Sequence, residues 1–240
     1  MDNDNIENNN VKSVKKVKIK KEKSKGREIM EWIVCVLIAV ILALFVRYFI
    51  STPTVVQQPS METTLMPNER LLLNKLAITM HSGFNRGDIV TFEAPSVTMV
   101  PSYMIDPNNP VAVYDWNING IFTKFAYYVL ETTKTSYIKR VIGLPGDHVQ
   151  IQNGKVYING QVLDEPYLQP GVVTQMLPET YFSDVIVPQN CLFLMGDNRG
   201  SSSDSRAFGC IPIDKIESKV LIRIWPLNKF RQGLNVIVAS

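Results

Sequence analysis

The chain has 240 residues and a formal net charge of +3 at pH 7; after a long N-terminal tail it leaves enough sequence for one sizeable domain or two small ones, and we expect one core. The positive excess is N-terminal, because residues 11–27 hold nine Lys or Arg against the single acid Glu22, whereas residues 51–240 hold 15 basic and 16 acidic side chains. A nucleic-acid-binding protein would carry its basic patch on the folded domain, so we expect no nucleic-acid partner and interpret residues 1–30 as a basic, disordered, cytoplasmic tail.

A hydrophobic segment follows the tail. Residues 32–46 contain no charge, and the apolar character resumes after Arg47 as far as Ile50. At about 1.5 Å per residue this stretch reaches roughly the 30 Å thickness of the hydrocarbon layer, so we predict a transmembrane anchor over residues 31–50. The basic flank predicts a cytoplasmic N-terminus and an extracytoplasmic domain over residues 51–240.

The same segment could instead be a cleaved secretory signal. The charged leader is long for such a signal, and no A-x-A cleavage site follows, because the exit from the apolar stretch reads F-I-S-T-P over residues 49–53. We therefore expect a single-pass protein of the cell membrane.

Beyond residue 50 the pattern predicts a mainly β domain. Short runs rich in β-branched or aromatic residues alternate with turn signals such as L-P-G-D at residues 144–147. The predicted strands cover residues 70–76, 88–92, 137–142, 148–151, 155–158 and 191–195. The Asn153-Gly154 pair suits a two-residue type I′ hairpin turn. Residues 96–136 are rich in proline and aromatic side chains and are predicted to be an insertion, within which residues 121–131 fit either a helix or a strand.

Two short stretches suggest chemistry: Q-P-S-M-E-T-T-L around Ser60 and Y-I-K-R-V-I-G-L-P-G-D around Lys139. A serine hydroxyl becomes a strong nucleophile only when a neighbouring base takes its proton. Histidine is the usual base, but this chain has only His81 and His148, so a lysine is a serious candidate. Taken alone, Ser60 is an ordinary turn residue and Lys139 an ordinary strand residue with its ammonium group in water.

A third stretch, G-D-N-R-G-S-S-S-D-S-R-A-F-G over residues 196–209, follows the apolar run at 191–195. It could be a flexible Gly/Ser loop, but its dense charges of both signs predict a folded, ion-paired loop. A calcium loop of the EF-hand type is excluded by Arg199 at a ligand position and by the lack of a closing Glu. We predict neither a metal nor another cofactor.

Through these stretches the chain resembles the type I signal peptidases, the membrane-bound Ser/Lys endopeptidases that remove signal sequences from exported proteins. The resemblance covers the single anchor and, in order, residues 60–65, 86–92, 137–147 and 196–212. One N-terminal span resembles the Gram-positive members more than the two-span Gram-negative ones. The resemblance implies a signal-peptidase-type β fold, preprotein substrates cleaved after small residues, and the secretion translocase and lipid bilayer as partners.

The resemblance also implies roles for individual residues. Ser60 is the nucleophile, Lys139 is the general base, and the hydroxyl of Ser202 helps to orient the lysine amine. The remaining polar residues of the third stretch support the site rather than react; they are Asp197, Asn198, Arg199, Asp204 and Arg206. An ordinary lysine has a pKa near 10.4, so Lys139 must be desolvated to act as a base. Adjacent strand side chains point to opposite faces, so Lys139 can face the site while Arg140 faces away.

The oxyanion is predicted to bind the backbone N–H of Ser60. In the family a Ser or Thr hydroxyl two residues before the nucleophile also donates to the oxyanion. Here that position is Gln58, so a second donor from the Gln58 amide is left open. Thr63 also replaces the usual Pro of the S-M-x-P-T-L pattern. Met61 is either near the cleft or an apolar side chain of the core or membrane face.

Two other functions are compatible with parts of the pattern. A catalytically impaired signal-peptidase-like protein acting in surface protein assembly would follow if Gln58 and Thr63 mark lost catalysis. A self-cleaving Ser/Lys repressor would need a DNA-binding domain and no membrane span, which the apolar segment argues against.

The cysteines carry one further prediction. Cys191 and Cys210 flank the third stretch and could form a disulfide on an oxidising side of the membrane. Their strand positions also suit small buried hydrophobic side chains, so we predict free thiols. Neither belongs to a Cys/His constellation, which argues against a sortase-like thiol transpeptidase.

Overall fold

The computed structural model describes residues 25–80, 82–101, 106, 109–115, 118–131, 134–175, 182–230 and 234. The chain divides into two compact units, Met1–Leu42 and Ala43–Ser240. Most of the tail predicted for residues 1–30, and His81 as well, lie outside the described residues.

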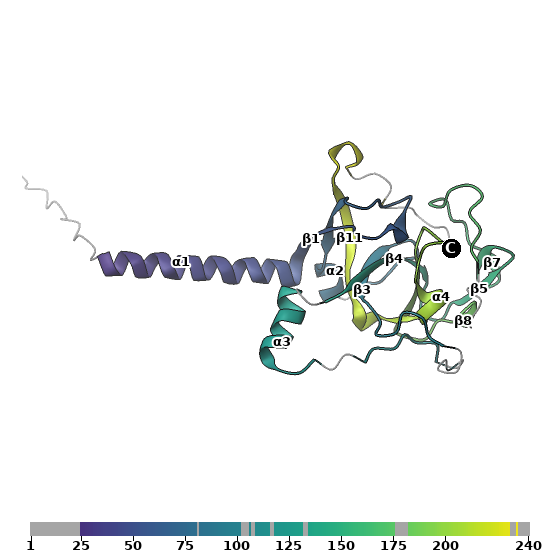
Figure 1. Ribbon diagram of the computed structural model, residues 1–240, viewed down its shortest axis with the longest axis horizontal. Helices are drawn as coiled ribbons and strands as arrows, with labels where there is room; N and C mark the ends of the chain where they lie inside the picture. Colours follow the sequence, from purple (N-terminus) through teal and green to yellow (C-terminus); the bar gives the residue numbers. More distant parts are fainter. Residues whose placement is uncertain are drawn as a thin grey trace, which may run out of the picture. The chain divides into compact units, whose positions relative to one another are not determined.

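The N-terminal helix α1 spans Lys25–Phe45 and continues as one π-helical turn, η1, over Val46–Ile50 (Figure 1). Apolar side chains surround α1, and none of its residues is buried. A helix whose surface is largely apolar and whose described residues are all unburied suits a lipid environment. By length and composition, Lys25–Ile50 can cross a membrane, and its 26 residues exceed the roughly 20 that a bilayer requires.

The larger sheet of the second unit is antiparallel and has the order β1-β2-β11-β3-β4-β9-β10. Its strands are β1 (Ser51–Val55), β2 (Arg70–Asn74), β3 (Ile89–Glu93), β4 (Ser136–Gly143), β9 (Cys191–Met195), β10 (Ile211–Pro212) and β11 (Ile216–Trp225). β1 is an edge strand, which explains how it tolerates Pro53. β9 pairs with β4 only from Arg140 onward, so the first half of β4 has a second, uncovered edge.

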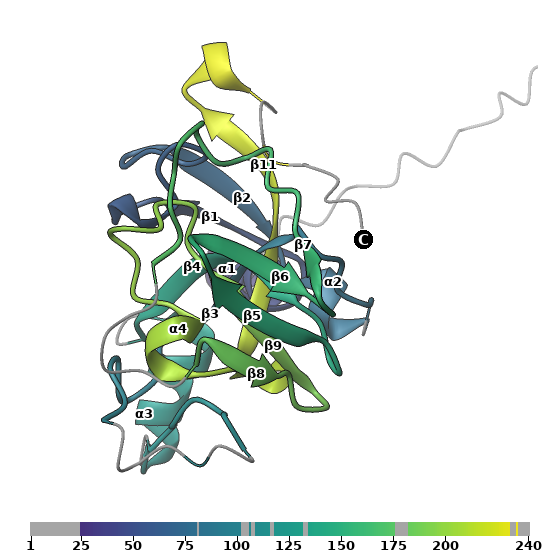
Figure 2. The ribbon, with the colours of Figure 1, turned by 90° about the vertical axis from the view of Figure 1, so that its right-hand side faces the viewer.

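A smaller antiparallel sheet has the order β7-β6-β5-β8. Its strands are β5 (His148–Gln152), β6 (Lys155–Ile158), β7 (Gln161–Val162) and β8 (Asp184–Ile186). Asn153 and Gly154 join β5 to β6 with φ angles of 52° and 76°, which is the backbone of the predicted type I′ turn. The smaller sheet lies on the opposite side of the unit from β1 (Figures 1 and 2).

Short helices connect the strands. They are η2 (Pro59–Met61), α2 (Leu76–Thr79), α3 (Ile121–Phe125), η4 (Ala126–Leu130), α4 (Ser205–Phe208), η5 (Ile213–Lys215) and η6 (Leu227–Lys229). The segment left open as helix or strand is therefore helical as far as Leu130, where Glu131 ends it in the left-handed region at φ 55°. The strand predicted over 70–76 ends at Asn74 because Leu76 begins α2.

Two groups of buried apolar side chains form the core. The larger group joins the two sheets through strands such as β3, β4 and β9. The smaller group packs beneath η2 and includes Val56, Met61, Leu65 and Leu71. Met61 is thus a core side chain with no exposed surface, the second of the two interpretations above. The mainly β prediction is confirmed by these sheets.

Candidate active site

Ser60 lies in the short helix η2, five residues after the edge strand β1 ends. Pro59 begins η2, and a proline suits the first helical position because its φ is already fixed near the helical value. The next residue, Met61, holds the turn in place because its side chain is fully buried in the smaller core group. Ser60 itself is only 4% exposed, so its position is fixed by packing.

Lys139 reaches Ser60 from the middle of β4. In the sheet it pairs with Val90 of β3, and its side chain is 1% exposed. The Lys139 Nζ donates to Ser60 Oγ at 2.8 Å and to the carbonyl oxygen of Ile138 at 3.1 Å. Two residues that are 79 positions apart in the chain thus form a direct amine–hydroxyl contact inside the protein.

The surroundings of Lys139 favour a neutral amine. Burial lowers its pKa from 10.5 to about 8, because desolvation penalises the charged form. The carboxylates of Asp204 and Asp197 oppose this by raising the pKa, and the Arg206 guanidinium lowers it further. At pH 7 roughly a tenth of a group with a pKa near 8 is uncharged, against about one in 3,000 for an ordinary lysine.

The loop after β9 fixes the backbone around Ser60. The Asn198 N–H donates to Ser60 O at 3.1 Å, and the Asn198 side-chain amide donates to Pro59 O at 3.2 Å. Gly196 lies directly against both Ser60 and Ser202: a Cβ at this position would collide with Ser60 O and Ser202 Oγ. Only glycine therefore lets the loop approach the Ser60 turn this closely.

Ser202 is 8% exposed, and its Oγ and the Ser60 carbonyl oxygen both lie next to the position that a Cβ on Gly196 would take. Within the described part of the chain no group meets its buried Oγ with hydrogen-bond geometry, Lys139 Nζ included. The hydroxyl nevertheless lies close enough to Asp204 to help lower the pKa of that carboxylate. Ser202 therefore lies near the Ser60 turn, and the amine-orienting role that the resemblance implies for it stays a prediction.

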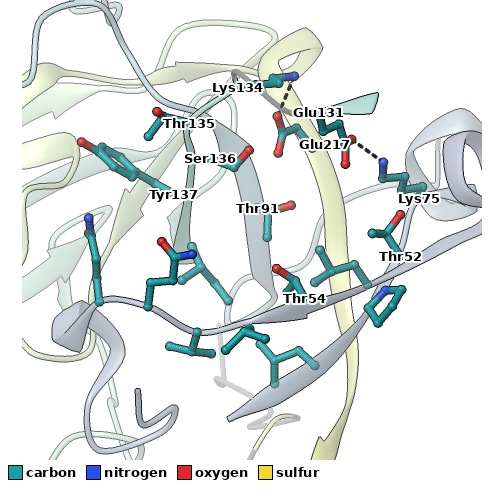
Figure 3. A pocket seen from close by; sticks show the side chains of 18 of the residues that line it. Thr52, Thr54, Lys75, Thr91, Glu131, Lys134, Thr135, Ser136, Tyr137 and Glu217 are labelled. Atoms are coloured by element: carbon teal, nitrogen blue, oxygen red, sulfur yellow. Dashed lines mark hydrogen bonds and ion pairs between the residues drawn. The ribbon is translucent and has the colours of Figure 1, made fainter. Parts of the chain in front are cut away.

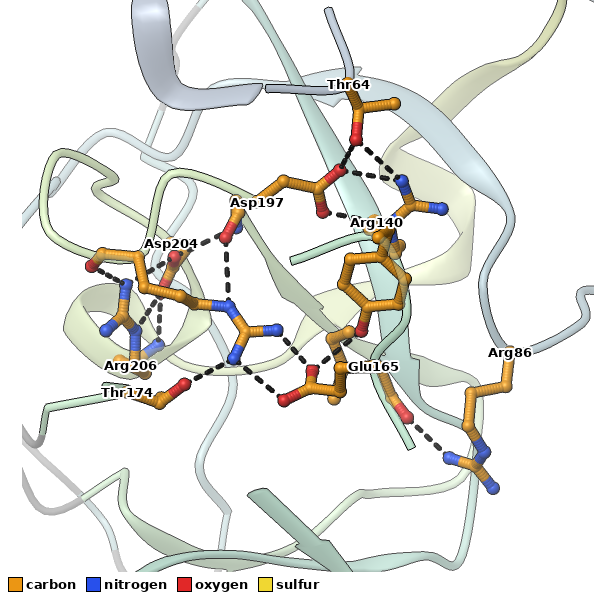
Figure 4. Close-up of polar contacts among 12 residues, drawn as sticks. Thr64, Arg86, Arg140, Glu165, Thr174, Asp197, Asp204 and Arg206 are labelled. Atoms are coloured by element: carbon orange, nitrogen blue, oxygen red, sulfur yellow. Dashed lines mark hydrogen bonds and ion pairs between the residues drawn. The ribbon is translucent and has the colours of Figure 1, made fainter. Parts of the chain in front are cut away.

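Three buried arginine–carboxylate pairs involve the loop after β9 that contacts the Ser60 turn (Figure 4). Arg140 binds Asp197 through Nε–Oδ1 at 2.8 Å and Nη2–Oδ2 at 2.6 Å, and its guanidinium lies 4.0 Å from the Tyr167 ring centroid. The other pairs are Arg206 with Asp204 and Arg199 with Glu165. Each carboxylate neutralises a guanidinium that would otherwise be buried without a partner.

Most ion pairs of this loop join it to other segments of the chain. Only the Asp204–Arg206 pair is internal to residues 196–209, with Nε–Oδ1 at 2.8 Å. Asp197 pairs instead with Arg140 of β4, and Arg199 with Glu165 and Thr174. Arg140 does face away from Ser60, but it holds the loop rather than standing apart from the site.

A pocket of about 420 Å³ opens beside Ser60 (Figure 3). One wall is the edge strand β1 and the following residues Gln57 and Gln58, and the other is the first half of β4 with Tyr137 and Ile138. Charged side chains line the far end: Arg47, Lys75, Glu131, Lys134 and Glu217. Local sequence patterns did not indicate this charged end, because its members come from four separate segments of the chain.

Gln58 lies in this pocket with an exposed side chain and an extended backbone, φ −110° and ψ 152°, before η2 begins. Among the described residues no cluster of three or more His, Cys, Asp or Glu side chains could hold a metal ion. Cys191 and Cys210 are buried free thiols, and burial raises the pKa of both.

The buried contact between Ser60 and Lys139 lies beside an open pocket, an arrangement compatible with a serine hydrolase. The family model for signal peptidases, peptidase S26, matches residues 29–225. Signal peptidase IB of Staphylococcus aureus strain COL is 32% identical over 221 residues, covering 87% of this chain and 96% of that protein. Signal peptidase I of Leptolyngbya laminosa is 32% identical over 201 residues, covering 84% and 82%. The crystal structure of a signal peptidase I from Enterococcus faecalis V583 aligns with 26% identity and a TM-score of 0.36, covering 58% of this chain and 97% of that one.

The chain belongs to the signal peptidase family, peptidase S26. It is a serine peptidase of the hydrolase class, with a role in signal peptide processing. Its apolar helix Lys25–Ile50 fits a membrane anchor.

Proposed function

We propose that this protein is a membrane-held endopeptidase in which Ser60 is the nucleophile and Lys139 the general base. The observation that carries the proposal is the 2.8 Å contact between Lys139 Nζ and Ser60 Oγ, made by an amine that is 1% exposed. A base must lie within hydrogen-bond reach of the proton it removes, and its pKa must lie near the working pH. Lys139 meets both conditions, since burial lowers its pKa to about 8.

In the proposed reaction the neutral Lys139 amine takes the proton of Ser60 Oγ as the oxygen attacks the peptide carbonyl. The tetrahedral intermediate collapses to an acyl-enzyme, and the Lys139 ammonium gives its proton to the leaving amine. Water then attacks the ester in the same way, with Lys139 again as base. The oxyanion donors are the Ser60 N–H, in the first turn of η2, and the side-chain amide of Gln58.

Ser202 is proposed to orient the amine. Its Oγ is buried beside Gly196 and lies close enough to Asp204 to help lower the pKa of that carboxylate. Asp197, Asn198, Arg199, Asp204 and Arg206 are proposed to support the loop that carries it. No metal or other cofactor takes part in this proposal.

The substrates are proposed to be exported preproteins, cleaved after a small residue such as Ala. The pocket beside Ser60 lies between β1 and the uncovered edge of β4, so an extended peptide could add to either strand through main-chain hydrogen bonds. Val56, Leu71 and Ile138 give the pocket apolar walls near Ser60. The basic run at residues 11–27 favours a cytoplasmic N-terminus, with the catalytic unit outside the cell membrane and near the secretion translocase.

The test is cleavage of a purified preprotein by the full chain in detergent, compared with Ser60→Ala and Lys139→Met. Each substitution should lower kcat/KM by about 10⁴-fold or more. Ser201→Ala and Lys155→Met, at exposed positions outside the site, serve as matched controls and should retain activity. Mass spectrometry of the product identifies the residue before the cut. Equal cleavage by the wild type and both site variants would overturn the proposal.

A further inference from the structure

The helical segment Ile121–Leu130, formed by α3 and η4, exposes an apolar face. Ile121 is 79% exposed and Phe122 is 87% exposed, while Phe125 and Tyr128 are 44% and 45% exposed. Tyr127 is the one buried residue of the segment, and Lys124 is its one charged residue. Figures 1 and 2 show α3 standing away from both sheets. Phe122, Phe125 and Tyr128 follow one another at spacings of three, and Ile121 precedes Phe125 by four, so the apolar residues form a stripe along the segment.

The segment is tied to the end of the membrane-crossing helix. Arg47 in η1 donates from Nη2 to the carbonyl oxygen of Leu130 at 2.8 Å. The next residue, Glu131, binds Lys75 Nζ at 2.5 Å, and Lys75 is the N-cap of α2. All of these residues belong to the unit Ala43–Ser240, so the contacts lie within one compact body.

The three short helices η1, α2 and α3–η4 meet around one cavity of about 550 Å³, which is lined by residues of all three. Apolar side chains are exposed on each of them: Tyr48, Phe49, Leu76, Met80, Ile121, Phe122, Phe125 and Tyr128. We call these eight residues the interfacial patch. A patch of this kind on a soluble surface marks an interaction site.

Continuity with the anchor identifies what covers the patch. η1 is the last turn of Lys25–Ile50, so a chain that crosses the bilayer there brings η1 to the water interface. Aromatic side chains are favoured at that depth, and Lys124 can extend its ammonium to the headgroups while its stem stays in the apolar layer. A helix satisfies its own backbone groups, so the segment can enter the boundary between headgroups and acyl chains.

We propose that α3–η4 is a second membrane contact, lying in the bilayer surface with Phe122 and Phe125 in the acyl boundary. It rests on the membrane anchorage of Lys25–Ile50 and is independent of the roles given to Ser60 and Lys139. Two contacts with the bilayer restrict the tilt and rotation of the catalytic unit more than one contact does. Arg47, Lys75 and Glu131, which tie the segment in place, also line the pocket that contains Ser60, so the contact sets the height of this pocket above the lipid.

The test places an environment-sensitive NBD fluorophore on the full chain in phosphatidylcholine nanodiscs that hold one copy each. Cys35→Ala removes the exposed thiol, and Cys191 and Cys210 are buried, so a new cysteine is labelled selectively. The labelled positions are Phe122→Cys and, as a matched control, Ile186→Cys, which lies in β8 and is 67% exposed. At position 122 we expect blue-shifted emission, several-fold weaker quenching by aqueous iodide than at 186, and strong quenching by lipids spin-labelled near the headgroup.

Three outcomes would overturn the proposal. Iodide quenching as strong at 122 as at 186 would mean that the patch faces water. Protection that appears only when two chains share a nanodisc would assign the patch to a second copy. Protection without quenching by spin-labelled lipids would mean that another part of the same chain covers it. Ile121→Cys, at 79% exposure, repeats the measurement should Phe122→Cys unfold the protein, as judged by thermal melting.

Discussion

Lys139 and Arg140 are neighbours in β4, and their side chains point to opposite faces of the strand. Lys139 Nζ contacts Ser60 Oγ at 2.8 Å, whereas Arg140 binds Asp197 with two hydrogen bonds of 2.8 and 2.6 Å. One strand therefore positions the amine beside the hydroxyl and, on its other face, holds the loop that carries Asn198 and Ser202. Small movements of β4 would displace all three parts of the site together.

The pH dependence of cleavage should report the Lys139 amine. Because burial lowers its pKa to about 8, kcat/KM should fall about tenfold for each pH unit below 8 and level off above it. Activity falls with decreasing pH because only the neutral amine can accept the Ser60 proton, and protonation removes that form. The measurement is kcat/KM for a short peptide substrate between pH 6 and 10.

A matched control separates lysine from histidine. His148 lies on β5, where it binds Asp184 on the surface, and His148→Gln should leave the profile unchanged. An inflection near pH 6.5, moved or removed by that substitution, would assign the base to histidine and contradict the role of Lys139.

The Arg140–Asp197 pair should be the most costly ion pair to break. Its two side chains are 0% and 1% exposed, so Arg140→Met leaves a buried carboxylate without its partner. We expect a loss of about 3–5 kcal/mol in unfolding free energy, and a similar loss for Asp197→Asn with the partner guanidinium left unpaired. The measurement is denaturant-induced unfolding of the full chain in detergent.

The double variant Arg140→Met/Asp197→Asn should lose much less than the sum of the single losses, because neither charge is then left alone. Asp184→Asn, which breaks an exposed pair with His148, is the control and should cost less than about 1 kcal/mol. Additive effects at Arg140 and Asp197 would show that the two residues are not energetically coupled.

Local sequence patterns predicted those parts of the fold that local signals specify. Residues 155–158 and 191–195 match β6 and β9, since each run is apolar or alternating and ends at a turn. The longest strand, β11, gave no prediction. Its alternation is broken by register shifts at Val220/Ile222 and Arg223/Trp225, so no regular period-2 pattern appears in the sequence. β1 was missed for a related reason, because Pro53 argues against any strand except an edge strand.

The candidate site likewise contains residues that the sequence pointed to and residues that it did not. Ser60 and Lys139 were identified through residues that resemble a family, and the 2.8 Å contact between them is compatible with the predicted pair. The partners of Asp197 and Arg199 were not identified. Their ion pairs join residues 57 and 34 positions apart, and nothing in the local sequence indicates which of several arginines or carboxylates will meet. Gly196 was also overlooked, since its role depends on the approach of the Ser60 turn from another segment.

Gly196→Ala should damage catalysis more than folding. The new Cβ would collide with Ser60 O and Ser202 Oγ and lie 2.6 Å from Ser202 Cβ, so the two serines must move apart. A displacement of about 1 Å at a reacting group costs roughly 100-fold in rate, and we expect a loss of that order in kcat. The measurement is kcat and KM together with the thermal melting temperature.

Gly200→Ala is the matched control within the same loop, because a Cβ there meets no atom within 4 Å. It should leave kcat within about twofold, since surface substitutions away from packed features rarely matter. Equal effects of the two substitutions would mean that the loop responds to lost glycine flexibility rather than to the collision at Ser60.

Thiol labelling should separate the three cysteines by environment. Cys191 and Cys210 are 5% and 0% exposed, and burial raises the pKa of both thiols, so neither should react with iodoacetamide in the native protein in detergent. Unfolding without a reductant should make both reactive, because they are free thiols and not a disulfide. Intact mass spectrometry counts the added groups, and the Cys35→Ala variant removes the contribution of the anchor. In that variant we expect two carbamidomethyl groups to be added on unfolding without reductant. If no group is added without reductant and two are added with it, Cys191 and Cys210 are bonded to each other.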